Sequence, residues 1–115
     1  MRIRLVLAVA ACAAATTAVA HHGWSAYDAE KTLTLTGTIE ASGYEHPHGF
    51  IRLQTRGKTW LAVLAPPYRM ENRGLPREWL KPGTQITVVG YPHRTDAQEM
   101  RAERIVVNGK TIELR

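Results

Sequence analysis

The sequence predicts an all-β protein with one short helix, folded as a small OB-like β-barrel of five to six strands. Three observations support this prediction: a long alternating segment interrupted by a glycine, two glycine-containing hairpin links, and one short helical segment between them. The order strand, strand, strand, short helix, strand, strand, with a first strand that curls, is that of an OB-like barrel. A six-stranded small barrel of another topology is the alternative.

Residues 1–20 have the features of a cleavable export signal. Arg2 and Arg4 give a positive start, residues 5–15 form an apolar core too short to span a bilayer, and Ala18-Val19-Ala20 is a small-residue cleavage site. We therefore expect a periplasmic protein that has no transmembrane anchor in its mature form.

Cleavage after residue 20 would make His21 the first residue of the mature chain. In the alternative, residues 9–12 act as a lipobox, Cys12 carries a lipid, and His21 becomes internal. Because Cys12 is the only cysteine, a domain that lacks it can form neither a disulfide framework nor a thiolate metal site.

The remaining chain is long enough for one small domain. We expect an N-terminal arm over residues 21–30, packed onto the domain by Trp24, and an OB-like barrel over residues 31–115. The formal net charge of the whole chain is +5 and its cations are scattered, so nucleic-acid binding is not predicted.

Alternating leucines and threonines over residues 31–39 predict a long, half-buried first strand, and Gly37 in its apolar face indicates a bulge or sharp bend. Residues 50–55 and 59–64 predict a hairpin. The second of these strands is the most apolar, so we expect it to be central.

A proline pair before residues 68–73 and Gly74 after them predict a short helix. Residues 75–82 are expected to be irregular, with Trp79 and Leu80 plugging the end of the barrel.

Residues 86–90 and 99–107 predict the fourth and fifth strands. Asn108-Gly109 is the strongest hairpin signal in the chain, and it leads to a short last strand over residues 111–114. Met70 and Met100 are expected in the core.

Two polar loops hold the other three histidines. Residues 41–49 include His46 and His48, and residues 91–98 include His93. The corresponding loops of an OB fold flank one face of the barrel. A proline between His46 and His48 favours extended chain, so we expect these two side chains to point the same way.

The histidines suggest a copper site. A terminal His21 can chelate one ion through its α-amine and its imidazole, and a second imidazole would complete an all-nitrogen site suited to copper. His22 is a competing donor. His48 is the preferred distant ligand, His46 the second choice, and His93 the weakest because surface exposure explains it more simply.

We therefore expect a copper-binding protein that acts in storage, delivery or protection, with a copper-handling or other envelope protein as its partner. The alternative is a metal-free OB-like binding module that presents the face between the two loops to an envelope protein or glycan. Tyr44 and the arginines at positions 52, 94 and 101 could line a binding face for an anionic or sugar-like ligand, although scattered surface arginines are the simpler interpretation.

No nucleophile–base motif, carboxylate pair or phosphate-binding glycine loop supports an enzyme class. An oxygen-activating copper enzyme is a third hypothesis. The oligomeric state is not predicted.

Several motifs together resemble a family of small secreted bacterial proteins known mainly as a domain of unknown function. They are His21-His22-Gly23-Trp24, Pro47-His48, Pro66-Pro67-Tyr68-Arg69-Met70, Leu80-Lys81-Pro82-Gly83 and Val88-Val89-Gly90-Tyr91-Pro92. The resemblance implies a signal peptide, one small β-barrel, a paired histidine at the mature start and an Asn-Pro-His in the first loop. His46 stands at the asparagine position, and the resemblance supplies no enzyme class.

The first prediction concerns the mature terminus. Intact-mass spectrometry of the exported protein should give a chain that starts at His21, because the small-residue site ends at residue 20. A lipid-modified chain that starts at Cys12 would contradict the terminal chelate.

Overall fold

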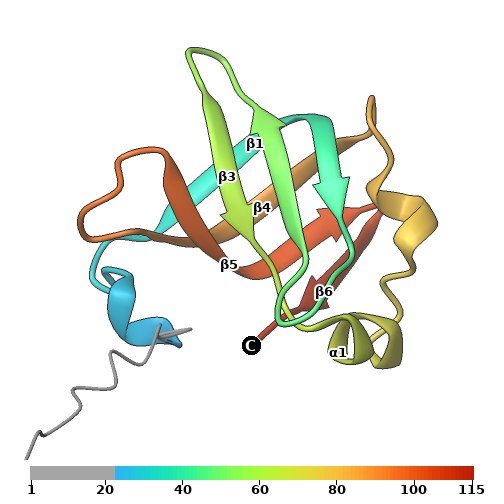
Figure 1. Cartoon of the computed structure of the whole chain (residues 1–115). Helices are drawn as coiled ribbons and strands as arrows, with labels where there is room; N and C mark the ends of the chain where they lie inside the picture. The colour runs from blue at the N-terminus through green and yellow to red at the C-terminus, as the bar shows by residue number, and fades with distance from the viewer. Residues whose placement is uncertain (1–22) are drawn as a thin grey trace, which may run out of the picture.

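Five strands form a closed barrel and a sixth extends its sheet in the computed structural model of this protein, which describes residues 23–115 (Figure 1). They are β1 (Leu33–Gly43), β2 (Phe50–Gln54), β3 (Thr59–Val63), β4 (Gln85–Pro92), β5 (Glu99–Val107) and β6 (Lys110–Glu113). The helix α1 (Pro67–Asn72) and the 3-10 turns η1 (Trp24–Ala26) and η2 (Arg77–Leu80) complete the elements. The predicted class, an OB-like barrel with one short helix, is confirmed.

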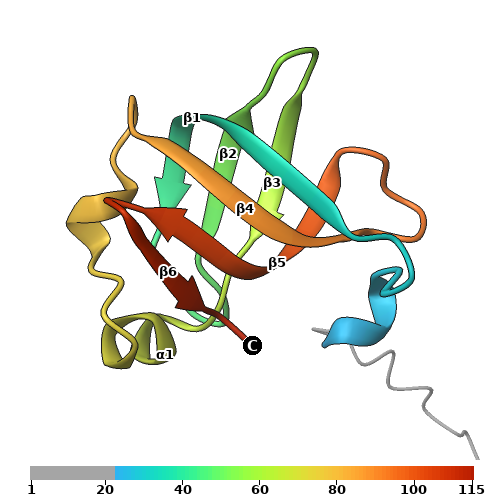
Figure 2. The ribbon, with the colours of Figure 1, turned by 180° about the vertical axis from the view of Figure 1, so that it is seen from behind.

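The long first strand organises the barrel because it pairs on both sides. β1 is antiparallel to β2 and to β4, and the sheet order is β3-β2-β1-β4-β5-β6 (Figures 1 and 2). Parallel pairing of β3 with β5, with Leu61 opposite Glu99, closes the barrel. β6 extends the sheet beyond β5.

The bulge in β1 lies beyond the glycine that predicted it. The register with β2 shifts between Ile39 and Ala41, whereas Gly37 pairs regularly with Ile86 of β4. Gly37 instead allows a close approach, since a Cβ there would collide with the backbone carbonyl of Gln54. The expectation of a bulge at Gly37 is therefore wrong by a few residues.

The two loops are shorter than expected because their strands continue. β1 runs to Gly43 and β4 runs to Pro92, so the loops span residues 44–49 and 93–98. Residues 75–82, expected to be irregular, contain the 3-10 turn η2.

Side chains that alternate inward along the strands form one core together with α1 and η2. Met70 and Met100 are completely buried in it, and Leu80 is almost so, with Trp79 packed alongside. The α1 helix lies at the end of the barrel away from the β2–β3 turn (Figure 1). No helix within residues 23–115 has both the length and the apolarity needed to cross a membrane.

β3 is paired on both sides, with β2 and β5, as expected for a central strand. Its residues are nevertheless less buried than their apolar character predicts. Only Ala62 of its five residues is buried, while Leu61 and Val63 face outward.

The hairpin predicted at Asn108-Gly109 is confirmed. These two residues have φ values of 51° and 71°, as a tight primed turn requires.

The second prediction tests the close approach at Gly37. Gly37→Ala should lower the free energy of unfolding by about 3 kcal/mol, because the backbone of Gln54 cannot move aside without disturbing two strand pairings. Urea denaturation would measure the loss. Thr34→Ala, on an exposed position of the same strand, is the control and should change stability by less than about 0.5 kcal/mol. Equal effects would show that the contact is not tight.

Candidate functional site

A cavity of about 500 Å³ lies on the outer face of the barrel, between the two polar loops. This volume is within the usual range for small-molecule sites. Its lining comes from the arm, both loops and the strands β2, β3 and β5, and includes Tyr27, His48, Phe50, His93 and Arg101. OB folds bind ligands on the corresponding face. The prediction that the two loops flank one face is confirmed.

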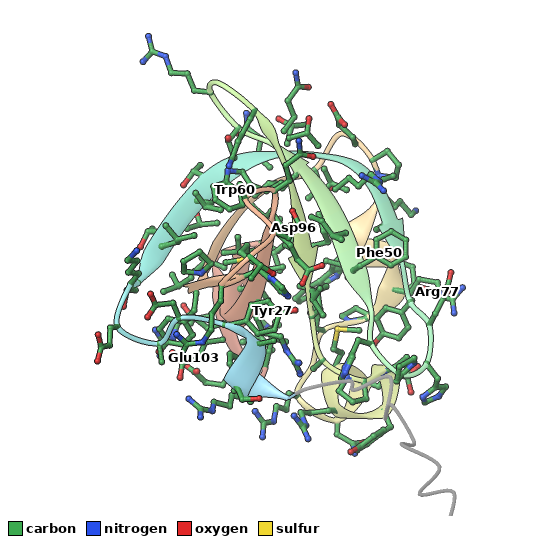
Figure 3. The ribbon with its side chains drawn as sticks, turned by 60° about the vertical axis from the view of Figure 1, so that its left-hand side comes forward. Tyr27, Phe50, Trp60, Arg77, Asp96 and Glu103 are labelled. Atoms are coloured by element: carbon green, nitrogen blue, oxygen red, sulfur yellow. The ribbon has the colours of Figure 1, made fainter. Side chains whose placement is uncertain are left out.

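Strand alternation determines which side chains reach the cavity. Along β2 the buried positions are Ile51 and Leu53, so Phe50 and Arg52 point outward. Outward positions of β3 and β5 complete the floor, and they are Leu61, Val63, Glu99 and Arg101. Tyr27 of the arm and Phe50 of β2, which both line the cavity, are labelled in Figure 3.

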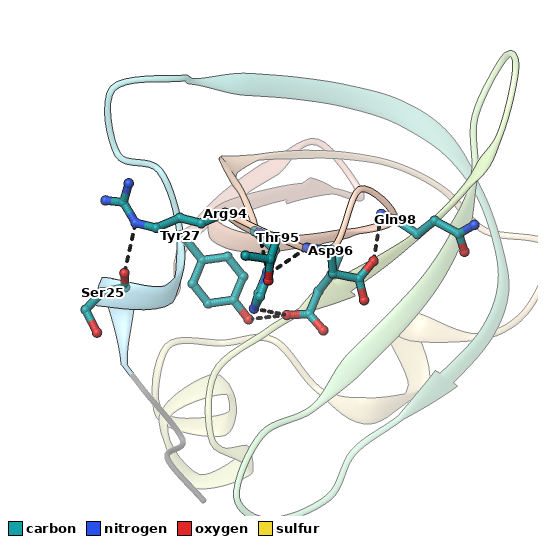
Figure 4. Close-up of polar contacts among 8 residues, drawn as sticks. Ser25, Tyr27, Arg94, Thr95, Asp96 and Gln98 are labelled. Carbon is teal, nitrogen blue, oxygen red and sulfur yellow. Dashed lines mark hydrogen bonds and ion pairs between the residues drawn. The ribbon is translucent and has the colours of Figure 1, made fainter.

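The arm is attached to the second loop by backbone hydrogen bonds. Tyr27 forms a β-bridge with His93, and the Arg94 amide donates to the carbonyl of Ala26 at 2.9 Å. The Arg94 side chain donates to the Ser25 carbonyl at 3.1 Å (Figure 4). These contacts make the arm one wall of the cavity.

Tyr27, Glu99 and His93 form a polar cluster within the cavity (Figure 4). The Tyr27 hydroxyl donates to Glu99 Oε2 at 2.7 Å, and His93 Nε2 lies 3.8 Å from the same oxygen. Burial, and then the hydrogen bond to the carboxylate, raise the pKa of Tyr27 well above its usual value. The tyrosine therefore remains a donor over the whole physiological pH range.

Both ring nitrogens of His93 face protein groups. Nδ1 accepts from the backbone amides of Thr95 at 3.2 Å and Asp96 at 3.0 Å, which leaves the ring proton on Nε2, toward Glu99. His93 would have to leave these contacts to bind a metal ion. The role that this geometry supports is to fix the second loop.

The two histidines of the first loop differ in position. His48 is half-buried and lines the cavity, whereas His46 is exposed at a bend and does not line it. The peptide bond between His46 and Pro47 is cis. Because only His48 reaches the cavity, the expectation that the two side chains point the same way is wrong. His21 and His22 lie outside the described residues.

Arg101 is buried, contrary to the interpretation of the arginines as surface groups. Its exposed fraction is 6%, and its guanidinium carbon lies 4.8 Å from the centre of the Trp24 ring. Burial lowers the pKa of Arg101, and the positive charges of Arg69 and Arg115 act in the same direction. Trp24 thus packs the arm onto the barrel, as predicted, and in doing so covers this cation.

Within residues 23–115, no three side chains of histidine, cysteine, aspartate or glutamate lie together as a group that could hold a metal ion. Sequence reasoning missed Tyr27 and Glu99 because they are far apart in the chain. Alternation over residues 99–107 places Glu99 and Arg101 on one face, and that is the signal that could have paired them.

Comparison with known proteins gives a family and a fold. A family of unknown function (DUF6152) matches residues 8–101. No curated protein matches the chain in sequence. Among solved structures, the chain is similar to part of a crystal structure of TiaS in complex with an isoleucine tRNA and ATP, with a TM-score of 0.53 and 17% identity. The match covers 77% of this chain but only 20% of that one, so it supports the fold alone.

The third prediction concerns the buried tyrosine. Tyr27→Phe should lower the free energy of unfolding by about 1.5–3 kcal/mol near neutral pH, because Glu99 loses a hydrogen bond to its charged carboxylate. The raised pKa makes this contribution complete below about pH 10 and removes it progressively above that value. The difference from wild type should therefore shrink in alkaline solution.

Urea denaturation at about pH 8 and about pH 11 would measure this difference. Tyr68→Phe, at the exposed tyrosine of α1, is the control and should change stability by less than about 0.5 kcal/mol at either pH. A difference for Tyr27→Phe that stays constant with pH would contradict the assignment.

Proposed function

The chain belongs to a family of unknown function (DUF6152), and we propose that it is a periplasmic copper-binding protein whose metal is held by an N-terminal histidine. The ligands would be the α-amine and imidazole of His21 and the imidazole of His48. The single observation that carries the proposal is that His48 lines the same cavity as Ala26 and Tyr27 of the arm.

Chain length supports a shared site. His21 precedes Trp24, the first residue of η1, by three residues, which span at most roughly 11 Å when extended. We therefore expect the terminus to lie within reach of the cavity wall while the arm stays paired with the second loop. Nitrogen donors without thiolates favour Cu(II) among the common divalent ions.

The positions of the three described histidines suggest which of them is the distant copper ligand. His48 is the expected distant ligand because it is half-buried in the cavity. His93 is held by its contacts with Asp96 and Glu99, and His46 is exposed outside the cavity. Copper would be stored, delivered or sequestered by this site, with another envelope protein as donor or acceptor.

A second candidate function is binding of a ligand without metal. It is favoured by the cavity itself, which has apolar walls of Phe50, Leu61 and Val63 on the face where OB folds bind ligands.

The fourth prediction separates these functions by Cu(II) titration calorimetry. One alanine added before His21 should lower the Cu(II) affinity by about 100-fold or more, because it removes the amine donor. His48→Ala should have a comparable effect. Affinity should also weaken steeply between about pH 7 and pH 5, since amine and imidazole must both lose a proton to bind.

His46→Ala and His93→Ala are matched controls that each remove one imidazole from a loop. The first should keep the wild-type affinity, and the second should keep it with some loss of stability. Wild-type affinity in the extended variant would exclude the terminal chelate and leave the metal-free function.

A further inference from the structure

Arg101 of β5 is a buried cation whose Nε atom has no hydrogen-bond partner among the residues that the structure describes. Its Nε atom is fully enclosed, and its exposed fraction is 6%. Its contact with the Trp24 ring, 4.8 Å from the guanidinium carbon to the ring centre, is a cation–π contact and supplies no hydrogen-bond acceptor for Nε. Buried charges are normally paired, because an unpaired one loses its hydration without compensation.

The carboxylate that shares the cavity with Arg101 is already engaged. Glu99 lines the same cavity, but it accepts from Tyr27 and faces His93, and it makes no ion pair with Arg101 within the described chain. Arg101 and the exposed Arg52 are the two cations of the lining, and Glu99 is its one carboxylate. Counting these three groups, the cavity therefore has an excess of one positive charge, which suits a monoanion.

The remaining walls are apolar. Phe50, Leu61 and Val63 line the cavity, and their contact with a hydrocarbon group would remove apolar surface from water. We propose that this cavity binds a monocarboxylate with an apolar body, whose carboxylate accepts hydrogen bonds from the Arg101 guanidinium. The planar fork of a guanidinium matches the two oxygens of a carboxylate.

This site does not depend on copper. It requires Arg101 and the apolar wall, whereas the copper site requires His21 and His48. Carboxylate binding is therefore measured on purified protein in the presence of a chelator. A failure of one site then leaves the other unaffected.

The fifth prediction uses isothermal titration with defined probes. The probes are 3-phenylpropionate, its uncharged amide, acetate, inorganic phosphate, and an acetylated tetrapeptide ending in phenylalanine with a free or an amidated C-terminus. The phenylpropionate should bind saturably, and its amide and acetate should bind about tenfold more weakly or worse. Binding of the free-acid peptide in preference to its amide would identify a chain end as the source of the carboxylate.

Two variants test whether Arg101 binds the carboxylate. Arg101→Met should weaken phenylpropionate binding by about tenfold or more, yet should melt no lower than wild type, because it removes an unpaired buried charge and keeps most of the volume. Arg56→Gln, at the exposed β2–β3 turn, is the matched control and should bind as wild type does.

Two results of the phenylpropionate titrations would overturn the proposal. One is equal affinity of the wild-type protein for the acid and its amide, a comparison that needs no variant to fold. The other is an Arg101→Met variant that binds phenylpropionate normally, which would show that the guanidinium does not contact the ligand. Stronger binding of phosphate than of phenylpropionate would also exclude the apolar monocarboxylate.

Discussion

Closure of the barrel by the parallel pairing of β3 with β5 is the constraint on which the rest of the structure depends. It places Leu61 opposite Glu99 and Val63 opposite Arg101, so apolar and charged side chains become neighbours on the outer face. The arm can then pair with His93 and cover Arg101 with Trp24. The cavity and its cation are both consequences of this one junction.

Most of the fold could be predicted because its signals are local. The alternation in residues 99–107 gave the bounds of β5, and Asn108-Gly109 gave the final turn. The errors arose where a distant partner decides the outcome. β1 continues to Gly43 because β2 pairs with it, and the bulge follows the β2 register rather than the position of Gly37.

The site was less predictable for the same reason. The position of the loops in an OB fold predicted that His48 and His93 lie on one face. It could not reveal that the two ring nitrogens of His93 contact the backbone amide of Asp96 and the carboxylate of Glu99. Arg101 was interpreted as a surface residue because Trp24, which packs over it, belongs to the N-terminal arm and is far from it in the sequence. Periodicity tells which face a side chain occupies, and it does not tell what covers that face.

The long-range strand pairings also determine how the protein reaches its native state. Leu33 pairs with Gly90 and Leu61 with Glu99, so each pairing closes a large loop of the chain. The entropic cost of closing that loop precedes the favourable contacts that offset it. Chains dominated by such contacts fold on timescales of about milliseconds to seconds. The cavity joins the arm, both loops and β3 to β5, so it exists only after the slowest of these closures. A ligand that binds in the cavity would stabilise the closed barrel. It would lower the population of molecules in which the barrel is open, in proportion to the occupancy of the cavity.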